Sequence, residues 1–178
     1  EFYHSMVHFD GNKANGLSAR NLTVDNTTLS ASENGANGIH ITGNGVIENN
    51  SIVDVYRNKC ELLTKWTIPA AIRVQGNGSF TVDKSATLTV MENKGSGIGV
   101  GSSAKAEIWT GIIKNNEAQK LEFGGGIHNM GKVSLSSKVI LYNNHAGNGA
   151  DDIYNGENAT LKFGDTNKEW ILDDCNHA

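Results

Sequence analysis

The sequence predicts an all-β chain folded as a right-handed single-stranded parallel β-helix, a solenoid of about six coils. Two kinds of position recur in register along the chain, and the differences in spacing between them fall at one point of the repeat. Self-similarity at a period of about 20–50 residues is typical of stacked repeat architectures. The clearest copy spans residues 124–144, which begin with glycines and the apolar Ile127 and close with Asn144.

The first recurring position is an asparagine that closes each unit. The pattern Val-x-Val-x-x-Asn ends at Asn58, and variants of it end at five further asparagines. The six closing residues are Asn12, Asn34, Asn58, Asn93, Asn116 and Asn144. Equivalent residues of successive coils stack on one another, so side-chain amides in such a column can hydrogen-bond along the stack. We therefore predict an internal asparagine ladder.

The second recurring position is an apolar anchor preceded by a small residue, usually glycine. The anchors are Leu17, Ile39, Ile72, Ile98, Ile127 and Ile153. The spacing from anchor to closing asparagine stays between 17 and 21 residues, whereas the spacing from asparagine to the next anchor varies from 5 to 14. Insertions therefore fall at one corner of the coil. We expect the glycine before the anchor to adopt positive φ in a tight bend, a conformation that costs little only for glycine.

A parallel β-helix explains both columns, because its strands alternate inward and outward side chains and its coils stack about 4.8 Å apart. A β-sandwich with turns every 8–12 residues or so gives no reason for this register. We predict the β-helix over residues 1–163, with large insertions at 59–71 and 117–126. The repeat is lost over residues 164–178, which we predict to be a C-terminal cap or exit segment that covers the open end of the stack.

The repeat resembles those of known bacterial surface proteins. GGGI at 124–127 followed by LYNN at 141–144 is similar to the GGA/GI…FxxN repeat of the chlamydial polymorphic outer-membrane proteins. Residues 151–155 and 172–175 resemble the last coil and exit segment of large β-helix surface proteins of Gram-positive gut bacteria. The resemblance covers most of residues 7–175. It implies a secreted or cell-surface bacterial protein, flanked by further domains of a longer chain.

Composition limits the possible partners. The 178 residues, 38% of them hydrophobic, suffice for the core of one domain. The net charge of −4, without a basic run, argues against nucleic acid as a partner. No apolar run is long enough to cross a bilayer, so we expect no membrane insertion. No Ser-His-Asp order, CxxC pair or phosphate-binding loop rises above chance, and we predict no metal and no cofactor.

The two cysteines, Cys60 in the first insertion and Cys175 after the last coil, lie about four rungs, or some 19 Å, apart along the stack. A disulfide requires Cα atoms within about 7 Å. The two residues could pair only if the tail folds back along the stack, and the sequence leaves both states open.

One outward column follows the anchors, and it is a candidate binding surface. It contains Ser18, His40, Arg73, Gly99, His128 and Tyr154. His40 and Arg73 would be neighbours about 5 Å apart, which suits a sugar-binding strip, and this sheet often carries the active site in pectate-lyase-like enzymes. His40 and His128 would be roughly 14 Å apart, too far to share a metal ion. The alternative is an ordinary solvated strand face.

Two acidic doublets, Asp151–Asp152 and Asp173–Asp174, could suggest glycoside hydrolysis. That chemistry needs two carboxyl groups about 5–9.5 Å apart that face one sugar. Neighbouring residues on a strand point to opposite faces, so neither doublet fits. We assign no catalytic residue and expect no glycan turnover by this chain alone.

The insertion corner is the second candidate binding surface. Its apolar residues are Leu62, Leu63, Trp66, Leu121 and Phe123. Insertions on one side of a solenoid commonly form its binding surface, and tryptophan is enriched among interface hot spots. The alternative is a satellite core packed over the stack.

The sequence thus favours a noncatalytic, adhesin-like binding module that recognises a host protein or a glycan. The resemblance to gut-bacterial surface proteins makes immunoglobulin a candidate partner, since some related proteins bind it. Other related proteins are glycosidases, so the alternative is a carbohydrate-active enzyme, either a glycoside hydrolase or a polysaccharide lyase, or a fragment of one. A protein partner is expected at the insertion corner around Leu63, Trp66 and Phe123 rather than on the column of His40, Arg73 and His128.

Overall fold

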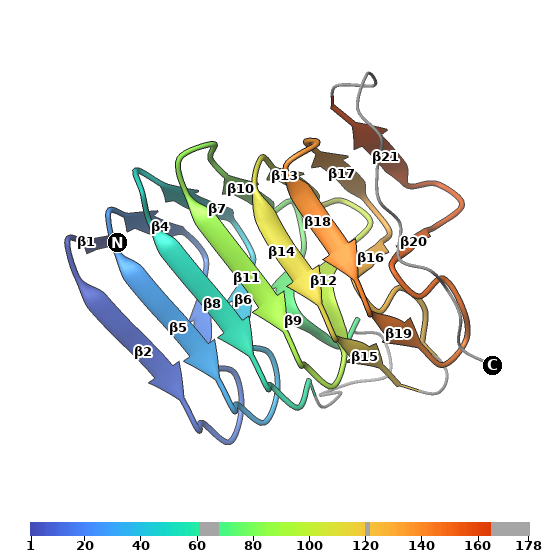
Figure 1. Cartoon of the computed structure of the whole chain (residues 1–178), viewed down its shortest axis with the longest axis horizontal. Coiled ribbons are helices and arrows are strands. Elements are labelled where there is room, and N and C mark those ends of the chain that lie inside the picture. Colours follow the sequence, from blue (N-terminus) through green and yellow to red (C-terminus); the bar gives the residue numbers. More distant parts are fainter. Residues whose placement is uncertain (61–67, 120–121, 165–178) are drawn as a thin grey trace.

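A computed structural model describes residues 1–60, 68–119 and 122–164 as a parallel β-solenoid of about six turns (Figure 1). Every strand pair in these residues is parallel, and strands are the only regular secondary structure in them. No helix capable of crossing a bilayer occurs in this part of the chain. The predicted fold class is confirmed, whereas the predicted cap lies almost wholly in residues 165–178, outside the described residues.

Three sheets surround one core. Sheet A contains β1 (Phe2–Tyr3), β4 (Leu22–Asp25), β7 (Asn44–Glu48), β10 (Ser79–Val82), β13 (Lys105–Ile108), β17 (Lys132–Leu135) and β21 (Thr160–Phe163). Sheet B contains β2 (Met6–Asp10), β5 (Thr28–Ser32), β8 (Ile52–Tyr56), β11 (Thr87–Met91), β14 (Gly111–Lys114) and β18 (Val139–Tyr142). Sheet C contains β3 (Leu17–Ala19), β6 (Ile39–Ile41), β9 (Ala70–Val74), β12 (Ser96–Val100), β16 (Ile127–Asn129) and β20 (Ile153–Asn155).

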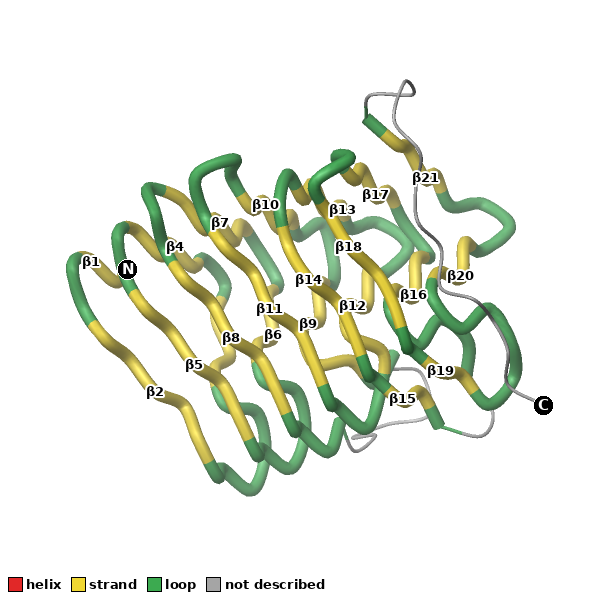
Figure 2. The backbone as a smooth tube through the Cα atoms, viewed as in Figure 1, coloured by secondary structure: helices red, strands yellow, loops and turns green. Residues whose placement is uncertain are grey.

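Each coil visits sheets C, A and B in turn before it returns to sheet C one rung further along (Figure 2). The anchors pair in one column of sheet C, from Leu17 opposite Ile39 to Ile127 opposite Ile153. The insertion corner therefore lies between sheets B and C. There the short strands β15 (Glu117–Ala118) and β19 (His145–Ala146) pair with each other.

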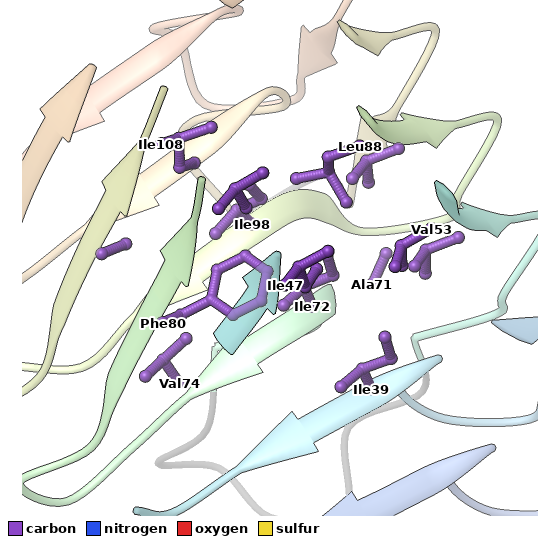
Figure 3. Packing of buried hydrophobic residues seen from close by; sticks show 14 of the residues in the cluster. Ile39, Ile47, Val53, Ala71, Ile72, Val74, Phe80, Leu88, Ile98 and Ile108 are labelled. Carbon is purple, nitrogen blue, oxygen red and sulfur yellow. The ribbon is translucent and has the colours of Figure 1, made fainter. Parts of the chain in front are cut away.

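The core consists of inward side chains stacked in columns along the axis. Phe80, the largest fully buried side chain, lies among aliphatic neighbours that include Ile47, Ile72 and Val74 (Figure 3). Its register partners on the adjacent strands are Gly45 and Ala106. Small residues on both sides of a large one keep the column filled without overlap, as close packing of a protein interior requires.

The asparagine ladder occupies the turn after sheet B and is confirmed in every coil. From Asn34 onward, each Oδ1 accepts hydrogen bonds from both the backbone N–H and the Nδ2 of the preceding ladder residue. The Nδ2-to-Oδ1 distances are 2.8–2.9 Å. In five ladder residues Nδ2 also donates to a backbone carbonyl in the preceding coil, as Asn58 does to Ala31 at 3.0 Å. Asn34 to Asn144 are buried, whereas Asn12 at the end of the stack is exposed.

The ladder has a direction and ends on a carboxylate. All its side-chain-to-side-chain hydrogen bonds are donated toward the C-terminal end of the stack, where Asn144 Nδ2 donates to Asp152 Oδ1 at 2.8 Å. Asp152 stands where the other coils have the small residue before the anchor. Aligned amide dipoles place partial positive charge at their N–H end, and an anion there is stabilised as it is at a helix N-terminus. Asp152 therefore completes the ladder.

A column of left-handed residues precedes the ladder. These residues are Gly11, Glu33, Arg57, Glu92, Asn115 and Asn143, with φ between +53° and +67°. The left-handed conformation costs a non-glycine residue about 1–2 kcal/mol. The sharp bend turns the following asparagine inward, where its hydrogen bonds offset that cost. Arg57 also lies 3.5 Å from Glu33 and 3.6 Å from Glu92, but these exposed ion pairs contribute little.

The glycines before the anchors have a role different from the one predicted. Gly16, Gly38, Gly97 and Gly126 have no positive φ, so the expected conformational reason is wrong. A Cβ on Gly16 would lie 2.6 Å from Asn34 Nδ2, and the same contact for the other three is 2.8–3.0 Å. The ladder side chain fills the space beside the glycine. Ala71, which is also buried, shows that one coil accepts a methyl group at this position.

Replacement of Asn93 by leucine, in the middle of the ladder, should lower the free energy of unfolding by about 3 kcal/mol or more. Two buried N–H groups of Asn58 would lose their acceptor, at about 1–3 kcal/mol each. Asn12→Leu at the exposed end should cost less than about 1 kcal/mol. Chemical denaturation of the two variants measures the difference, and equal losses would contradict the ladder as a stabilising element.

Replacement of Gly97 by alanine should destabilise the solenoid by about 1–3 kcal/mol through overpacking. Its Cβ would lie 2.8 Å from the Gly126 carbonyl oxygen and 2.9 Å from Ile113 Cγ2. Gly101 is the matched control, because a Cβ there would lie 3.4 Å or more from its neighbours. Thermal unfolding should show a lower midpoint for Gly97→Ala and a change within about 0.5 kcal/mol for Gly101→Ala.

Candidate binding strip on sheet C

The outward column predicted on sheet C exists as one row of side chains, which we name the sheet C strip. Successive register pairs join Ser18, His40, Arg73, Gly99, His128 and Tyr154. The strands that carry them differ in burial, because every residue of β9 and β12 is buried. The middle of the strip is therefore covered, and an ordinary solvated strand face does not describe it.

His40 and Arg73 are register neighbours, as predicted. His40 Nε2 lies 3.1 Å from Gln75 Oε1, and its Nδ1 lies 3.4 Å from Ser18 Oγ. Arg73 is only 6% exposed, and its Nε has no hydrogen-bond partner among the described residues. Burial, and then the charge of Arg73, lowers the pKa of His40, and burial also lowers the pKa of Arg73. The two side chains therefore place a buried cation beside an imidazole that favours its neutral form.

The residue after the undescribed part of the first insertion, Ile68, lies over the strip. A Cβ built on Gly99 would be 2.8 Å from Ile68 Cγ2. Glycine at this point of the column leaves room for the Ile68 side chain between Arg73 and His128. The first insertion thus reaches the face of sheet C.

The second insertion also reaches the strip, through Phe123. Its ring stacks on Tyr154 with centroids 4.6 Å apart and planes at 21°. His128 meets the Tyr154 ring edge-on at 5.1 Å, and its Nδ1 lies 3.0 Å from the Phe123 carbonyl oxygen. Burial lowers the pKa of His128. We call the half-buried Phe123, His128 and Tyr154 the aromatic trio.

The structure therefore joins two surfaces that lie apart in the sequence, the insertion corner and the sheet C strip. Phe123 belongs to the insertion corner by sequence but lies against the sheet C strip. The corner and the strip are therefore not alternative binding surfaces for this residue. The sequence places Tyr154 in the outward column but does not mark it as a binding residue. Tyr154 directly follows Asp152–Ile153, where aspartate replaces the small residue before the anchor, and this departure from the repeat is the sequence feature that could have pointed to it. Four corner residues, Leu62, Leu63, Trp66 and Leu121, lie outside the described residues.

The acidic doublet that lies within the described residues, Asp151–Asp152, makes hydrogen bonds inside the fold. Asp151 Oδ1 accepts the backbone N–H of Ala146 at 2.8 Å and lies 3.2 Å from His145 Nδ1. Asp152 Oδ1 ends the asparagine ladder. The second doublet, Asp173–Asp174, lies outside the described part of the chain. Within that part, no group of His, Cys, Asp and Glu side chains could hold a metal ion.

Cys60 is a free thiol buried at the start of the first insertion. Its Sγ lies 3.6 Å from the carbonyl oxygen of Asn58, and a Cβ on Gly95 would lie 2.5 Å from its Cβ. Burial raises its pKa, so the thiol is protonated and packs as a small apolar group. Its suggested partner, Cys175, lies outside the described residues.

Comparisons of the chain with protein-family models, with curated proteins and with solved structures gave no match.

Acidification from about pH 8 to pH 5 should lower the thermal unfolding midpoint. His40 and His128 have pKa values below the value of about 6.5 expected for the unfolded chain. In the pH range below 6.5 or so the unfolded state therefore binds more protons, and stability falls as the pH falls. The double variant His40→Gln/His128→Gln should show a shallower pH dependence. An unchanged slope would mean that other groups dominate the acid sensitivity.

Proposed function

We propose that the chain is a noncatalytic, adhesin-like binding module of a bacterial secreted or cell-surface protein, and that it holds a protein partner on the sheet C strip. The resemblance of its repeat to bacterial surface proteins motivates the location and the class. The aromatic trio motivates the position of the site. Immunoglobulin is the first partner to test, because some proteins with similar repeats bind it.

The aromatic trio carries the proposal. Phe123 and Tyr154 stack in a half-buried position on a rigid sheet, so binding would order few additional rotatable bonds. Tyrosine, tryptophan and arginine are the residue types most enriched among hot spots of protein interfaces. Ile68 adds apolar surface beside the trio, whereas Arg73 is buried in the covered middle of the strip and offers a partner little surface.

A protein fits this surface better than a sugar. Sugars commonly stack on the open face of an aromatic ring, but Phe123 and Tyr154 cover one face of each other. The T-shaped contact of His128 with the Tyr154 ring, at 5.1 Å, occupies a further part of the trio. A protein partner can fill such a surface with apolar and aromatic side chains of its own, and aromatic residues are enriched among the hot spots of protein interfaces.

Truncation of Tyr154 to alanine should weaken binding to a purified immunoglobulin about thirtyfold, the effect of a hot spot worth about 2 kcal/mol. Tyr142→Ala, on the outer face of sheet B, is the matched control and should leave affinity unchanged. Surface plasmon resonance with the immobilised chain measures both variants, and thermal unfolding shows that each remains folded.

Two results would contradict this assignment. Equal affinities for folded Tyr154→Ala and the unchanged chain would remove the partner from the strip. Release of sugar from pectin, mucin or milk-type oligosaccharides, abolished by replacement of one acidic residue, would favour the carbohydrate-active enzyme instead. A panel of uncleaved glycans tested alongside the immunoglobulin separates protein recognition from glycan recognition.

A further inference from the structure

A groove with a volume of about 360 Å³ runs across the outer face of sheet A, away from the sheet C strip. It crosses four strands, β10, β13, β17 and β21, which follow one another in the sheet toward its C-terminal end (Figure 1). We call it the sheet A groove. No sequence motif pointed to it, because its lining residues are single outward positions on four separate coils.

Two parallel ranks of side chains form the walls of the groove. The first rank is Ser79, Lys105, Lys132 and Thr160, which are register partners in that order. The second rank is Thr81, Glu107, Ser134 and Lys162. Between the ranks runs the inward column of Phe80, Ala106 and Val133, all of them buried. The floor is therefore strand backbone, and polar groups recur along it every 4.8 Å or so.

The groove is positively charged on an acidic chain. Three lysines and one glutamate line it, so its local formal charge is 3 − 1 = +2, whereas the whole chain carries −4. None of the three lysine ammonium groups has a carboxylate within 4.0 Å among the described residues. Glu107 accepts a hydrogen bond from Trp109 Nε1 at 3.0 Å. Within the described residues, these three cations therefore have no counter-ion.

Two of the lysines face each other in register. Lys105 and Lys132 are direct partners on β13 and β17, and each is exposed. Like charges directly opposite each other on adjacent strands are destabilising. An anion bound between the two ammonium groups would remove that repulsion, so this pair points to a ligand independently of the shape of the groove.

Hydroxyl groups accompany the cations along the whole groove. Ser79, Thr81, Ser134 and Thr160 each contribute one, and a hydroxyl can both donate and accept a hydrogen bond. Ser79 Oγ already donates to Asn44 Oδ1 at 2.8 Å, so it is left as an acceptor. Sugar hydroxyls have the same dual capacity. The lining offers no exposed aromatic ring on which a nucleobase could stack, since Phe80 is fully buried.

We propose that the sheet A groove binds an anionic polysaccharide. Lys105, Lys132 and Lys162 hold the carboxylate or sulfate groups, and the serine and threonine hydroxyls hydrogen-bond the sugar hydroxyls. The polysaccharide lies across the strands, along the solenoid axis, so that successive sugars meet successive rungs. This site is on a different face from the sheet C strip and does not depend on the function proposed above.

The test measures binding of polygalacturonate and of chondroitin sulfate to the full chain by isothermal titration calorimetry. Binding of at least one is expected, and the pair distinguishes carboxylate from mixed carboxylate and sulfate recognition. Each of Lys105→Gln and Lys132→Gln should weaken binding about three- to tenfold, and added salt should weaken it further. Lys114→Gln on sheet B removes the same charge elsewhere and should have no effect.

Ser134→Tyr tests the groove itself, because it keeps all three lysines but fills the space between the ranks. It should abolish binding while circular dichroism and thermal unfolding show an intact solenoid. Tyr154→Ala on the sheet C strip should leave polysaccharide binding unchanged, which separates the two sites. The proposal is overturned if neither polysaccharide binds, or if neutral dextran or a single-stranded oligonucleotide binds as well as they do. Equal losses in Lys114→Gln, or full binding by Ser134→Tyr, would also overturn it.

Discussion

The hydrogen bond from one asparagine amide to the next fixes the geometry on which the rest of the solenoid depends. Each Oδ1 accepts both the side-chain and the backbone N–H of its predecessor, so the turn after sheet B has one register in every coil. Because the amide is buried, a slip by one residue would leave several polar groups without partners, at about 1–3 kcal/mol each. The left-handed residue before the asparagine and the glycine beside it are both consequences of this turn.

The fixed register makes the outer faces regular arrays. Once the asparagines align, each outward position meets its equivalent about 4.8 Å away, and side chains from distant parts of the sequence form continuous ranks. The two lysines at the centre of the sheet A groove, Lys105 and Lys132, are adjacent for this reason. The sheet C strip arises in the same way. Substitution of one outward residue therefore changes one side chain of such a rank and leaves the side chains on the neighbouring coils in place.

The ladder also limits where the chain can vary. Every coil must deliver an asparagine to the same place, whereas the number of residues from that asparagine to the next anchor differs from coil to coil. Both insertions lie in this interval, and their described ends, Ile68 and Phe123, fold over sheet C rather than away from it. The insertion corner thus covers part of the outer face of sheet C. It places the apolar Ile68 and the aromatic Phe123 against the sheet C strip.

The sequence by itself determined the fold class, the six ladder residues, the anchor column and the corner that accepts insertions, because each depends on spacing along the chain. It also placed His40, Arg73 and His128 in one row. Only the tertiary structure decided that Arg73 is buried, that Phe123 stacks on Tyr154, and that the groove exists. These features depend on where the insertions fold and on how far outward side chains extend from the sheets. The spacing of residues along the chain does not specify either. The glycines before the anchors show the same limit. Their positions follow from the sequence, but the reason for glycine, the ladder amide packed beside each one, follows only from the stacking of the coils.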